Sequence, residues 1–205
     1  MAEKTSSGAR DRRSQIIESA IGLMSDHGVS GATTAKIAAE VGVSEPTLYR
    51  HFKNKQEILL AALDVTAVRL MFFSASAASN ARNVLERIRL MSGAIYDFGI
   101  ANPDEMRVLW EAINATRNEE MRSSLRTKFQ LMLRLMEGVL QEGITRGEIL
   151  EDIDVPLTAW EIASLGSTLY LALSLDLEDV LTRDKAMQAI DKLLDSITNK
   201  NEQDT

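Results

Sequence analysis

The sequence predicts an all-α fold in which a small N-terminal three-helix domain precedes a larger helical domain. Only three prolines occur in 205 residues, and the chain is rich in Ala, Leu, Glu, Arg and Met, which favour helix. Apolar residues recur at three- and four-residue spacing, the repeat of an amphipathic helix, and strand-like alternation is rare. We expect the domains to comprise residues 1–55, with a polar tail over about 1–9, and residues 56–205.

The first helix is expected to run from Ala9 to His27. Ile16 and Ala20 belong to a set of apolar residues at helical spacing, and Gly28 follows as a residue suited to a helix end. This helix should therefore turn one apolar side toward the rest of its domain.

Two short helices separated by a tight turn are expected between Thr33 and Lys55. Thr33 and Ser44 are good N-cap residues, and Gly42 between them suits a sharp turn. Leu48 and Phe52 should point inward, while the outward side chains are Thr47, Tyr49, Arg50 and His51. A helix, a short turn and a second helix is the geometry that delivers the second helix into the major groove of DNA.

The larger domain is expected to form six helices. Asn102-Pro103 and Asp154-Val155-Pro156 are start signals, because each combines a capping side chain with a proline tolerated in the first turn. The predicted segments are Lys55–Ala78, Arg82–Ala101, Pro103–Thr116, Asn118–Arg146, Val155–Leu175 and Thr182–Asn199.

Composition excludes several classes of protein. The chain has no cysteine, which removes disulfides and thiol nucleophiles, and its two histidines are too isolated to form a metal site. We find neither a secretory signal nor an uninterrupted apolar stretch of about 18 residues. No phosphate-binding loop or catalytic constellation emerges. We expect a cytoplasmic protein without membrane partner, cofactor or enzymatic activity.

Charge is unevenly distributed along the chain. Residues 1–55 contain eight Lys and Arg against six Asp and Glu, whereas the whole chain has a formal net charge of −7. A mildly basic head on an acidic body is compatible with a protein whose head alone touches phosphate.

The strongest signal is a motif in residues 33–55. T-T-A-K-I-A is followed by G-V-S-E-P-T-L-Y-R-H-F-K-N-K, which resembles the DNA-binding head of the TetR family of bacterial transcriptional regulators over about residues 10–60. This resemblance implies that Glu45, Pro46 and Thr47 face base edges. The full set of expected DNA-binding residues is Thr34, Ser44, Glu45, Pro46, Thr47, Tyr49, Arg50, His51 and Lys55.

Roles within that set differ. The resemblance makes Thr34 a backbone or base contact, Tyr49 and His51 phosphate contacts, and Lys55 a phosphate anchor. Thr47 has a methyl group for thymine, and Arg50 has the donors for guanine. Ala35 lies where some family members carry a base-reading arginine, so that contact should be missing.

Three of these residues have structural alternatives. Glu45 either accepts from a cytosine amine or interacts with the helix dipole. The alternative for Tyr49 is a half-buried core aromatic, and for His51 it is a solvated surface histidine.

Soft apolar side chains are abundant in the larger domain, and for most of them core packing is the simpler explanation. The TetR resemblance implies an effector cavity, for which methionines and aromatics make adaptable walls. Glu111, Asp97 and Arg134 are candidate polar anchors. The candidate pocket residues are Met91, Ile95, Phe98, Met106, Trp110, Phe129, Met132, Met136 and Leu169.

The last two predicted helices differ in their apolar patterns. In Val155–Leu175 apolar residues go most of the way round the helix, and in Thr182–Asn199 they lie along one side. Such a pair suits a four-helix bundle across a two-fold axis, although burial within one chain is the alternative. The candidate dimer residues are Trp160, Ala163, Gly166, Ser167, Tyr170, Ile190 and Leu194.

Together these patterns and the resemblance to the TetR family predict a homodimeric repressor that binds an inverted repeat in double-stranded DNA and is released by a small apolar or amphipathic effector. An activator or a corepressor-dependent regulator of the same fold is the nearer alternative. A helical small-molecule-binding or interaction module that does not bind DNA is the remoter one.

Overall fold

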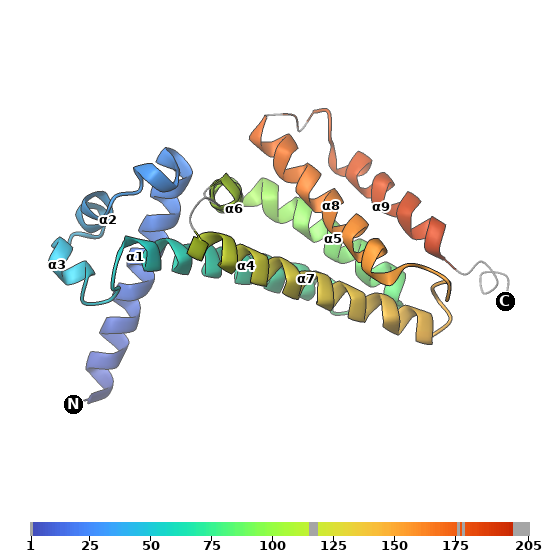
Figure 1. Ribbon diagram of the computed structural model, residues 1–205, viewed down its shortest axis with the longest axis horizontal. Helices are drawn as coiled ribbons and strands as arrows, with labels where there is room; N and C mark the ends of the chain where they lie inside the picture. Colours follow the sequence, from blue (N-terminus) through green and yellow to red (C-terminus); the bar gives the residue numbers. More distant parts are fainter. Residues whose placement is uncertain (1, 115–118, 176, 178, 199–205) are drawn as a thin grey trace. The chain divides into compact units, whose positions relative to one another are not determined.

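The computed structural model describes residues 2–114, 119–175, 177 and 179–198, with the side chains of 2–10, 114, 170, 173 and 174 excepted. Its regular elements are helices, which confirms the predicted fold class (Figure 1). In chain order they are α1 (Ala2–Gly31), α2 (Thr34–Val41), α3 (Glu45–Leu48), α4 (Lys55–Ala77), α5 (Val84–Ala101), α6 (Pro103–Asn114), α7 (Glu119–Thr145), α8 (Val155–Ser174) and α9 (Arg183–Ile197).

The start signals in the sequence were correct for the later helices. Helix α6 begins at Pro103 and α8 at Val155, where the Asp154 side chain accepts from the backbone N–H of Leu157 at 3.0 Å. The first helix differs, because it already begins at Ala2 and not at Ala9. Gly28, with a φ of 68°, interrupts its helical geometry, as the sequence predicted for the helix end.

The chain divides into two compact units. Unit 1 comprises residues 1–68 together with 104–125, and unit 2 comprises residues 69–103 and 126–205. Unit 1 therefore contains α6 and the beginning of α7 in addition to the three N-terminal helices and most of α4. The domain boundary expected after Lys55 falls at the first residue of α4, a helix that contributes to both units.

Helix α4 is long and apolar enough to cross a membrane by length and composition, with a mean hydropathy of 1.8 over its most apolar stretch. In unit 1 its residues Ile58, Leu59 and Leu63 are at most 2% exposed and belong to the core. Asp64 and Arg69 interrupt its apolar sequence. Core packing accounts for the apolar side chains in this part of α4.

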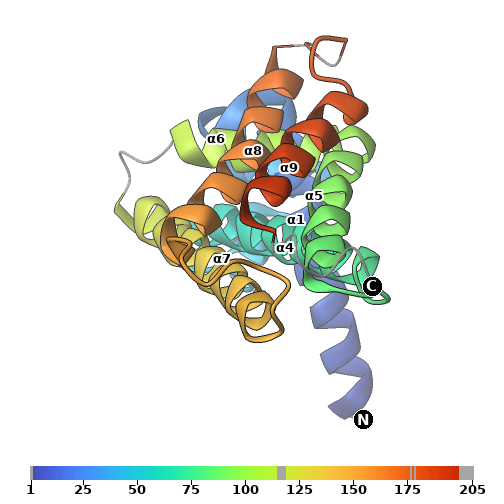
Figure 2. The ribbon, with the colours of Figure 1, turned by 90° about the vertical axis from the view of Figure 1, so that its right-hand side faces the viewer.

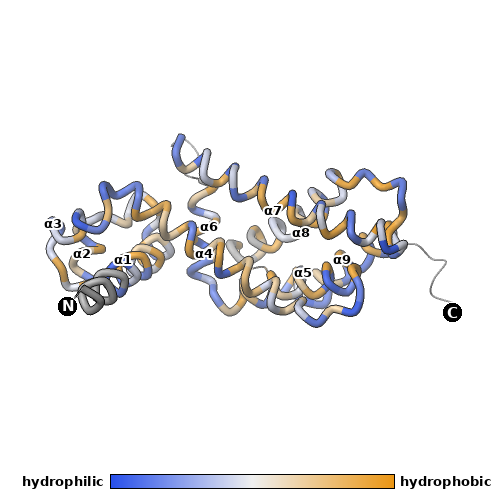
Figure 3. Tube along the Cα trace, turned by 90° about the horizontal axis from the view of Figure 1, so that it is seen from below, coloured by the Kyte–Doolittle hydropathy of each residue, from blue (hydrophilic) through white to orange (hydrophobic). Residues whose placement is uncertain are grey.

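The core of unit 2 is formed by side chains of α5, α7, α8 and α9, and among these α5, α8 and α9 contact one another in pairs (Figure 2). Met187, Ile190 and Leu194 project from α9 into this core, and polar residues occupy other faces of the helix, so that hydropathy alternates along it (Figure 3). Two Arg–Asp pairs tie α5 to α9. Arg89 and Asp191 form one and Arg183 and Asp97 the other, each through two hydrogen bonds of 2.7–3.2 Å.

Candidate nucleic-acid interface

Helices α2 and α3 form a capped helix–turn–helix. The Thr33 hydroxyl accepts from the backbone N–H of Lys36 at 3.3 Å, and the Ser44 hydroxyl accepts from that of Thr47 at 3.4 Å. Gly42 joins the helices with a φ of 71°, in the left-handed region that costs a side-chain-bearing residue about 1–2 kcal/mol. Capping and turn chemistry therefore fix this geometry locally, as the sequence predicted.

The apolar side chains of this segment face the core of unit 1. Ile37 and Leu48 are fully buried, and Phe52 is 1% exposed. The backbone continues beyond α3 in helical bonds, since the Phe52 N–H donates to the Leu48 carbonyl at 3.2 Å. Burial of Leu48 and Phe52 turns the polar side chains between and before them outward.

None of the nine expected DNA-binding residues is buried. Ser44, Pro46, Tyr49 and Arg50 are exposed, and Thr34, Glu45, Thr47, His51 and Lys55 are partly exposed. Tyr49 is 46% exposed and is not among the residues that form the core of unit 1. The set is available for a partner, although contact with DNA itself stays a prediction.

Several of these polar groups pair with each other. The Thr34 hydroxyl donates to Glu45 Oε2 at 3.0 Å, joining the first turns of α2 and α3. The hydroxyls of Ser44 and Thr47 lie 2.9 Å apart and share a hydrogen bond. The sequence indicated each of these residues separately but not their pairing.

Lys55 has an intramolecular partner as well. Its Nζ donates to the carbonyl of Ser30 at 3.3 Å, near the end of α1. Partial burial lowers the pKa of Lys55, because desolvation penalises the charged ammonium. The same ammonium therefore stabilises the end of α1 and remains a candidate phosphate contact.

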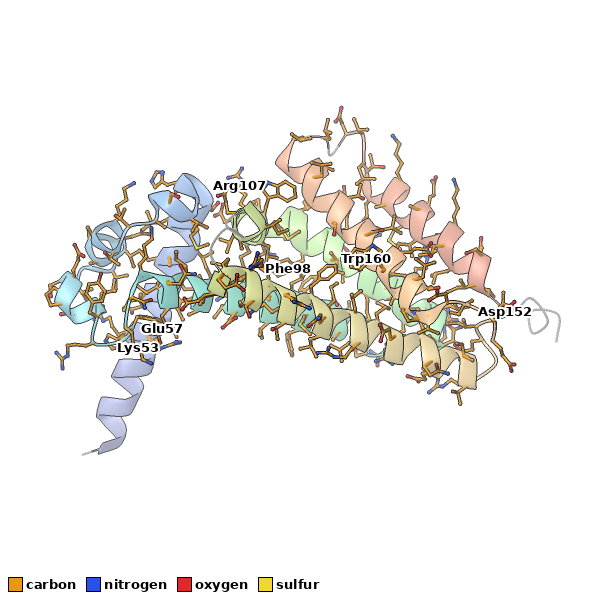
Figure 4. The ribbon with its side chains drawn as sticks, in the orientation of Figure 1. Lys53, Glu57, Phe98, Arg107, Asp152 and Trp160 are labelled. Carbon is orange, nitrogen blue, oxygen red and sulfur yellow. The ribbon has the colours of Figure 1, made fainter. Side chains whose placement is uncertain are left out.

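The side chains of Asn54, just before α4, and Glu57, in its first turn, cap the beginning of α4 (Figure 4 labels Lys53 and Glu57). The Glu57 carboxylate accepts from the backbone N–H of Lys53 at 2.6 Å, and the Glu57 N–H donates to the Asn54 side chain at 2.8 Å. These bonds fix the segment between α3 and α4, in which the outward-facing Lys53 lies.

Two arginines of α1 that the sequence did not single out contact the helix–turn–helix. The Arg13 guanidinium lies 4.6 Å from the centre of the Phe52 ring, a cation–π contact. Arg12 donates to the Val41 carbonyl at 3.4 Å, at the end of α2. In the sequence these two arginines are visible only as positive charges, because no local pattern indicates which ring or carbonyl each one contacts.

Helix α6 is attached to the same unit. The Ser25 hydroxyl donates to Asp104 Oδ1 at 2.8 Å, and the side chains of Val108 and Ala112 lie in the core of unit 1. A Cβ at Gly28 would lie 3.0 Å from Glu111 Oε2, so α6 approaches α1 closely there. Glu111, considered as an effector anchor, therefore lies against α1.

The candidate pocket residues are divided between the units. Met106 and Trp110 belong to unit 1, and the other seven belong to unit 2. Phe98, Met106 and Leu169 are buried, Phe129 is 37% exposed, and the rest are half-buried: Met91, Ile95, Trp110, Met132 and Met136. Asp97, another proposed anchor, is engaged by Arg183.

Unit 2 contains a cavity of about 340 Å³ between the end of α4, the beginning of α5 and the end of α7. Met91 is the one candidate pocket residue among those that line it. Arg87 and Arg146 both contact the carboxylate of Glu142 in its wall, at 3.1 and 2.6 Å. The cavity is thus more polar than the expected effector site.

The candidate dimer residues divide by helix. On α8, Trp160 and Ser167 are exposed, and Ala163 and Gly166 are half-buried. On α9, Ile190 and Leu194 are 4% and 6% exposed, and both face the core of unit 2. The side chain of Tyr170 lies outside the described residues.

One aromatic pair within unit 2 connects two of the predicted sets, and a second lies between α4 and α5. Trp160 packs edge to face on Phe129 of α7, with ring centroids 5.3 Å apart. Figure 4 labels Trp160 on α8 and Phe98 on α5, and the Phe98 ring meets Phe73 of α4 at 5.6 Å. The Phe129 contact places a candidate pocket residue beside a candidate dimer residue.

Comparisons with known proteins agree on the kind of molecule. Residues 16–62 match the family model described as bacterial regulatory proteins, tetR family. Over 143 residues the chain is 32% identical to the nucleoid occlusion factor SlmA of Salmonella dublin, covering 69% of this chain and 72% of that protein. Over 148 residues it is 26% identical to the fatty acid metabolism regulator protein of Bacillus subtilis, covering 72% of this chain and 76% of that protein.

A solved structure has the same fold. The transcriptional regulator FadR from Bacillus subtilis in complex with stearoyl-CoA superposes with a TM-score of 0.75. The superposition covers 90% of this chain and 97% of that one, at 22% identity. At this identity the likeness establishes the architecture.

Proposed function

This chain belongs to the TetR family of bacterial regulatory proteins, and from that premise we propose that it is a homodimeric repressor that binds an inverted-repeat operator and is released by an effector with an apolar chain. Its fold and family make it a DNA-binding transcriptional regulator. The dimer, the operator and the effector are the content of the proposal.

The capped helix–turn–helix is the observation that carries the proposal. Leu48 and Phe52 are buried under α3, and the residues around them present hydroxyl, carboxylate, imidazole and guanidinium groups to the outside. A rigid short helix with outward polar groups is suited to base edges, and flanking Tyr49 and Lys55 are suited to phosphates.

An exposed stripe on α8 supports a dimer. Leu157 and Trp160 are each 53% exposed and Leu171 is 44% exposed, at spacings that place them on one side of the helix. Exposed apolar residues aligned in this way favour association with a second copy. On α9, the half-buried Ala186, Ala189 and Leu193 are better placed to join them than Ile190 and Leu194, which the core of unit 2 occupies.

A dimer of this kind would read two half-sites. Helix–turn–helix dimers place their reading helices one DNA turn apart, about 34–36 Å, so the target should be an inverted repeat. An effector can release the operator only if it binds more tightly to a state in which the two helix–turn–helix motifs have a different spacing. A coupling of about 1–3 kcal/mol would change operator affinity about 5- to 150-fold.

The effector class rests on a relative. The FadR of Bacillus subtilis has a solved complex with stearoyl-CoA, and the fatty acid metabolism regulator of that organism resembles this chain over three quarters of its length. The apolar side chains of unit 2, among them the paired rings of Phe73 and Phe98, suit an acyl chain better than a polar ligand.

Nucleoid occlusion is the second candidate, because the 32% identity to SlmA exceeds that to the fatty acid regulator. A repressor should release its operator when an acyl-CoA binds, whereas the second candidate requires no such release.

The test is a selection of duplexes with a randomised segment by the purified full chain at near-physiological salt. We expect recovery of an inverted repeat, and subsequent release by stearoyl-CoA but not by free coenzyme A at the same concentration. A retained motif without two-fold symmetry would contradict the dimeric repressor, and unchanged binding with stearoyl-CoA would contradict the effector class.

A further inference from the structure

Glu45 is an unusual residue for a surface that approaches DNA. A carboxylate can only accept hydrogen bonds, and phosphate oxygens repel it. It therefore has a favourable role in the major groove only opposite a base-edge donor. Two such donors exist there, the N4 amine of cytosine and the N6 amine of adenine.

The structure holds this carboxylate in place from one side. Thr34 donates its hydroxyl proton to Glu45 Oε2 at 3.0 Å across the gap between α2 and α3, and both side chains are partly buried. Within the described residues, Glu45 Oε1 has no hydrogen-bond or ion-pair partner. One oxygen is thus used internally and the other is left to accept.

The same bond removes Thr34 as a donor to phosphate. A threonine hydroxyl has one proton, and Glu45 receives it. Ser44 and Thr47 are paired at 2.9 Å on the same first turn of α3, so this turn is held by two independent side-chain bonds. Fixing a side chain before binding reduces the conformational entropy that it loses in the complex.

We propose that Thr34 is a positioning residue that orients Glu45 to accept from the N4 amine of one cytosine in each half-site. Cytosine fits better than adenine, because the N7 acceptor beside the adenine amine repels a carboxylate. The inference rests on the proposed function, since it assumes that α3 enters the major groove. It assigns Thr34 to base specificity through Glu45 and not to the DNA backbone.

The experiment repeats the duplex selection with the full chain and three variants, Glu45→Gln, Thr34→Val and Thr34→Ser. Valine matches threonine in shape but lacks the hydroxyl, and serine keeps the hydroxyl. Melting curves followed by circular dichroism establish that each variant is folded. Affinities are then measured on the selected duplex and on its derivatives changed at one base pair.

We expect the unaltered chain to prefer cytosine at one position of each half-site by roughly five- to tenfold. Glu45→Gln should change that preference to adenine, because an amide can pair with both N6 and N7. Thr34→Val should lose most of the preference at this position alone, and Thr34→Ser should retain it.

Two results would overturn the inference. One is a Thr34→Val variant with the cytosine preference of the unaltered chain. The other is a uniform loss of affinity in Thr34→Val across the selected duplex and all its single-base-pair derivatives, which is the behaviour of a phosphate contact.

Failure of the proposed function would look different. A selected motif that lacks two-fold symmetry but depends on Glu45 for its cytosine would contradict the dimeric repressor and support this inference. Absence of any selected motif would contradict both.

Discussion

The polar side chains of the helix–turn–helix in unit 1 pair at short range along the chain, whereas those that join α5 to α9 in unit 2 pair at long range. Thr34 and Glu45, which are bonded across the turn between α2 and α3, are 11 residues apart in sequence. Arg89 and Asp191, which join α5 to α9, are 102 residues apart, and Asp97 and Arg183 are 86 apart. The helix–turn–helix surface is therefore fixed by residues close in sequence, whereas the α5–α9 pairs of unit 2 form only when distant helices have packed.

This comparison has a functional consequence. Changes in the outward side chains of residues 33–55 should alter what the protein recognises, because those side chains are available to a partner and locally fixed. Changes in the α5–α9 pairs should alter the stability of unit 2 and leave recognition of DNA sequence as it is. The following predictions test this separation in order of decreasing effect.

The largest effect is expected for Phe52→Ala. Phe52 is 1% exposed and supports both α3 and the Arg13 guanidinium, so its truncation should lower the free energy of unfolding by about 3–5 kcal/mol. Denaturant titration followed by circular dichroism measures this loss. Phe72→Ala is the matched control, because Phe72 is 74% exposed and its truncation should change stability by about 0.5 kcal/mol or less. Equal losses in the two variants would contradict the assigned core.

Gly42→Ala should have the next largest effect. The backbone at Gly42 has a φ of 71° and open space around an added Cβ, so the cost is conformational, about 1–2 kcal/mol. Gly22→Ala is the control, since Gly22 lies inside α1 with equally open space and alanine should stabilise the helix by about 0.5–1 kcal/mol. Thermal melting of both variants measures the difference. Stabilisation by Gly42→Ala would refute the strained turn.

A smaller effect is expected from the Arg183–Asp97 pair. The hydrogen bonds that Arg183 donates to Asp97 raise the pKa of Arg183, but both side chains are about half exposed, so solvent screens their attraction. A double-mutant cycle with Arg183→Gln and Asp97→Asn should give a coupling of about 0.2–1 kcal/mol that shrinks at high salt. The base preference of the protein for DNA should not change in these variants. A shifted base preference would contradict the separation of the two units.

The smallest effect concerns pH. The hydrogen bond from Arg82 lowers the pKa of Glu86 at the beginning of α5 below its ordinary value of 4.5. A lowered carboxyl pKa stabilises the folded state above the unfolded pKa, and this stabilisation is lost as pH falls through the folded pKa. Carbon NMR titration should find Glu86 titrating at lower pH than in Arg82→Gln. Coincident titrations would show that the pair has no influence in solution.

The sequence predicted what depends on neighbours along the chain. Thr33 and Ser44 cap their helices, Gly42 makes the turn, and Leu48 and Phe52 point inward, because short-range bonds and helical spacing decide each of these features. The starts of α6 and α8 follow from capping side chains beside proline in the same way.

Long-range proximity could not be predicted. Asp97 was one of three candidate effector anchors in the sequence, and the fold pairs it with Arg183. Ile190 and Leu194 were candidates for a dimer interface, and they lie in the core of unit 2, which is the alternative that the sequence left open. The contact between α6 and α1 is made by Ser25 and Asp104, and no local pattern in the sequence indicates that these two residues meet.

The most direct test of the central claim, that two copies of this reading surface bind one duplex together, is the affinity for duplexes that differ only in half-site spacing. Fluorescence anisotropy of the selected inverted repeat should be compared with duplexes carrying about 5 and about 10 additional base pairs between the half-sites. Because half a turn places the half-sites on opposite faces of the helix, the claim predicts a large loss of affinity for the first insertion and partial recovery for the second. Equal affinity for all three duplexes would show that single chains bind half-sites independently and would contradict the claim.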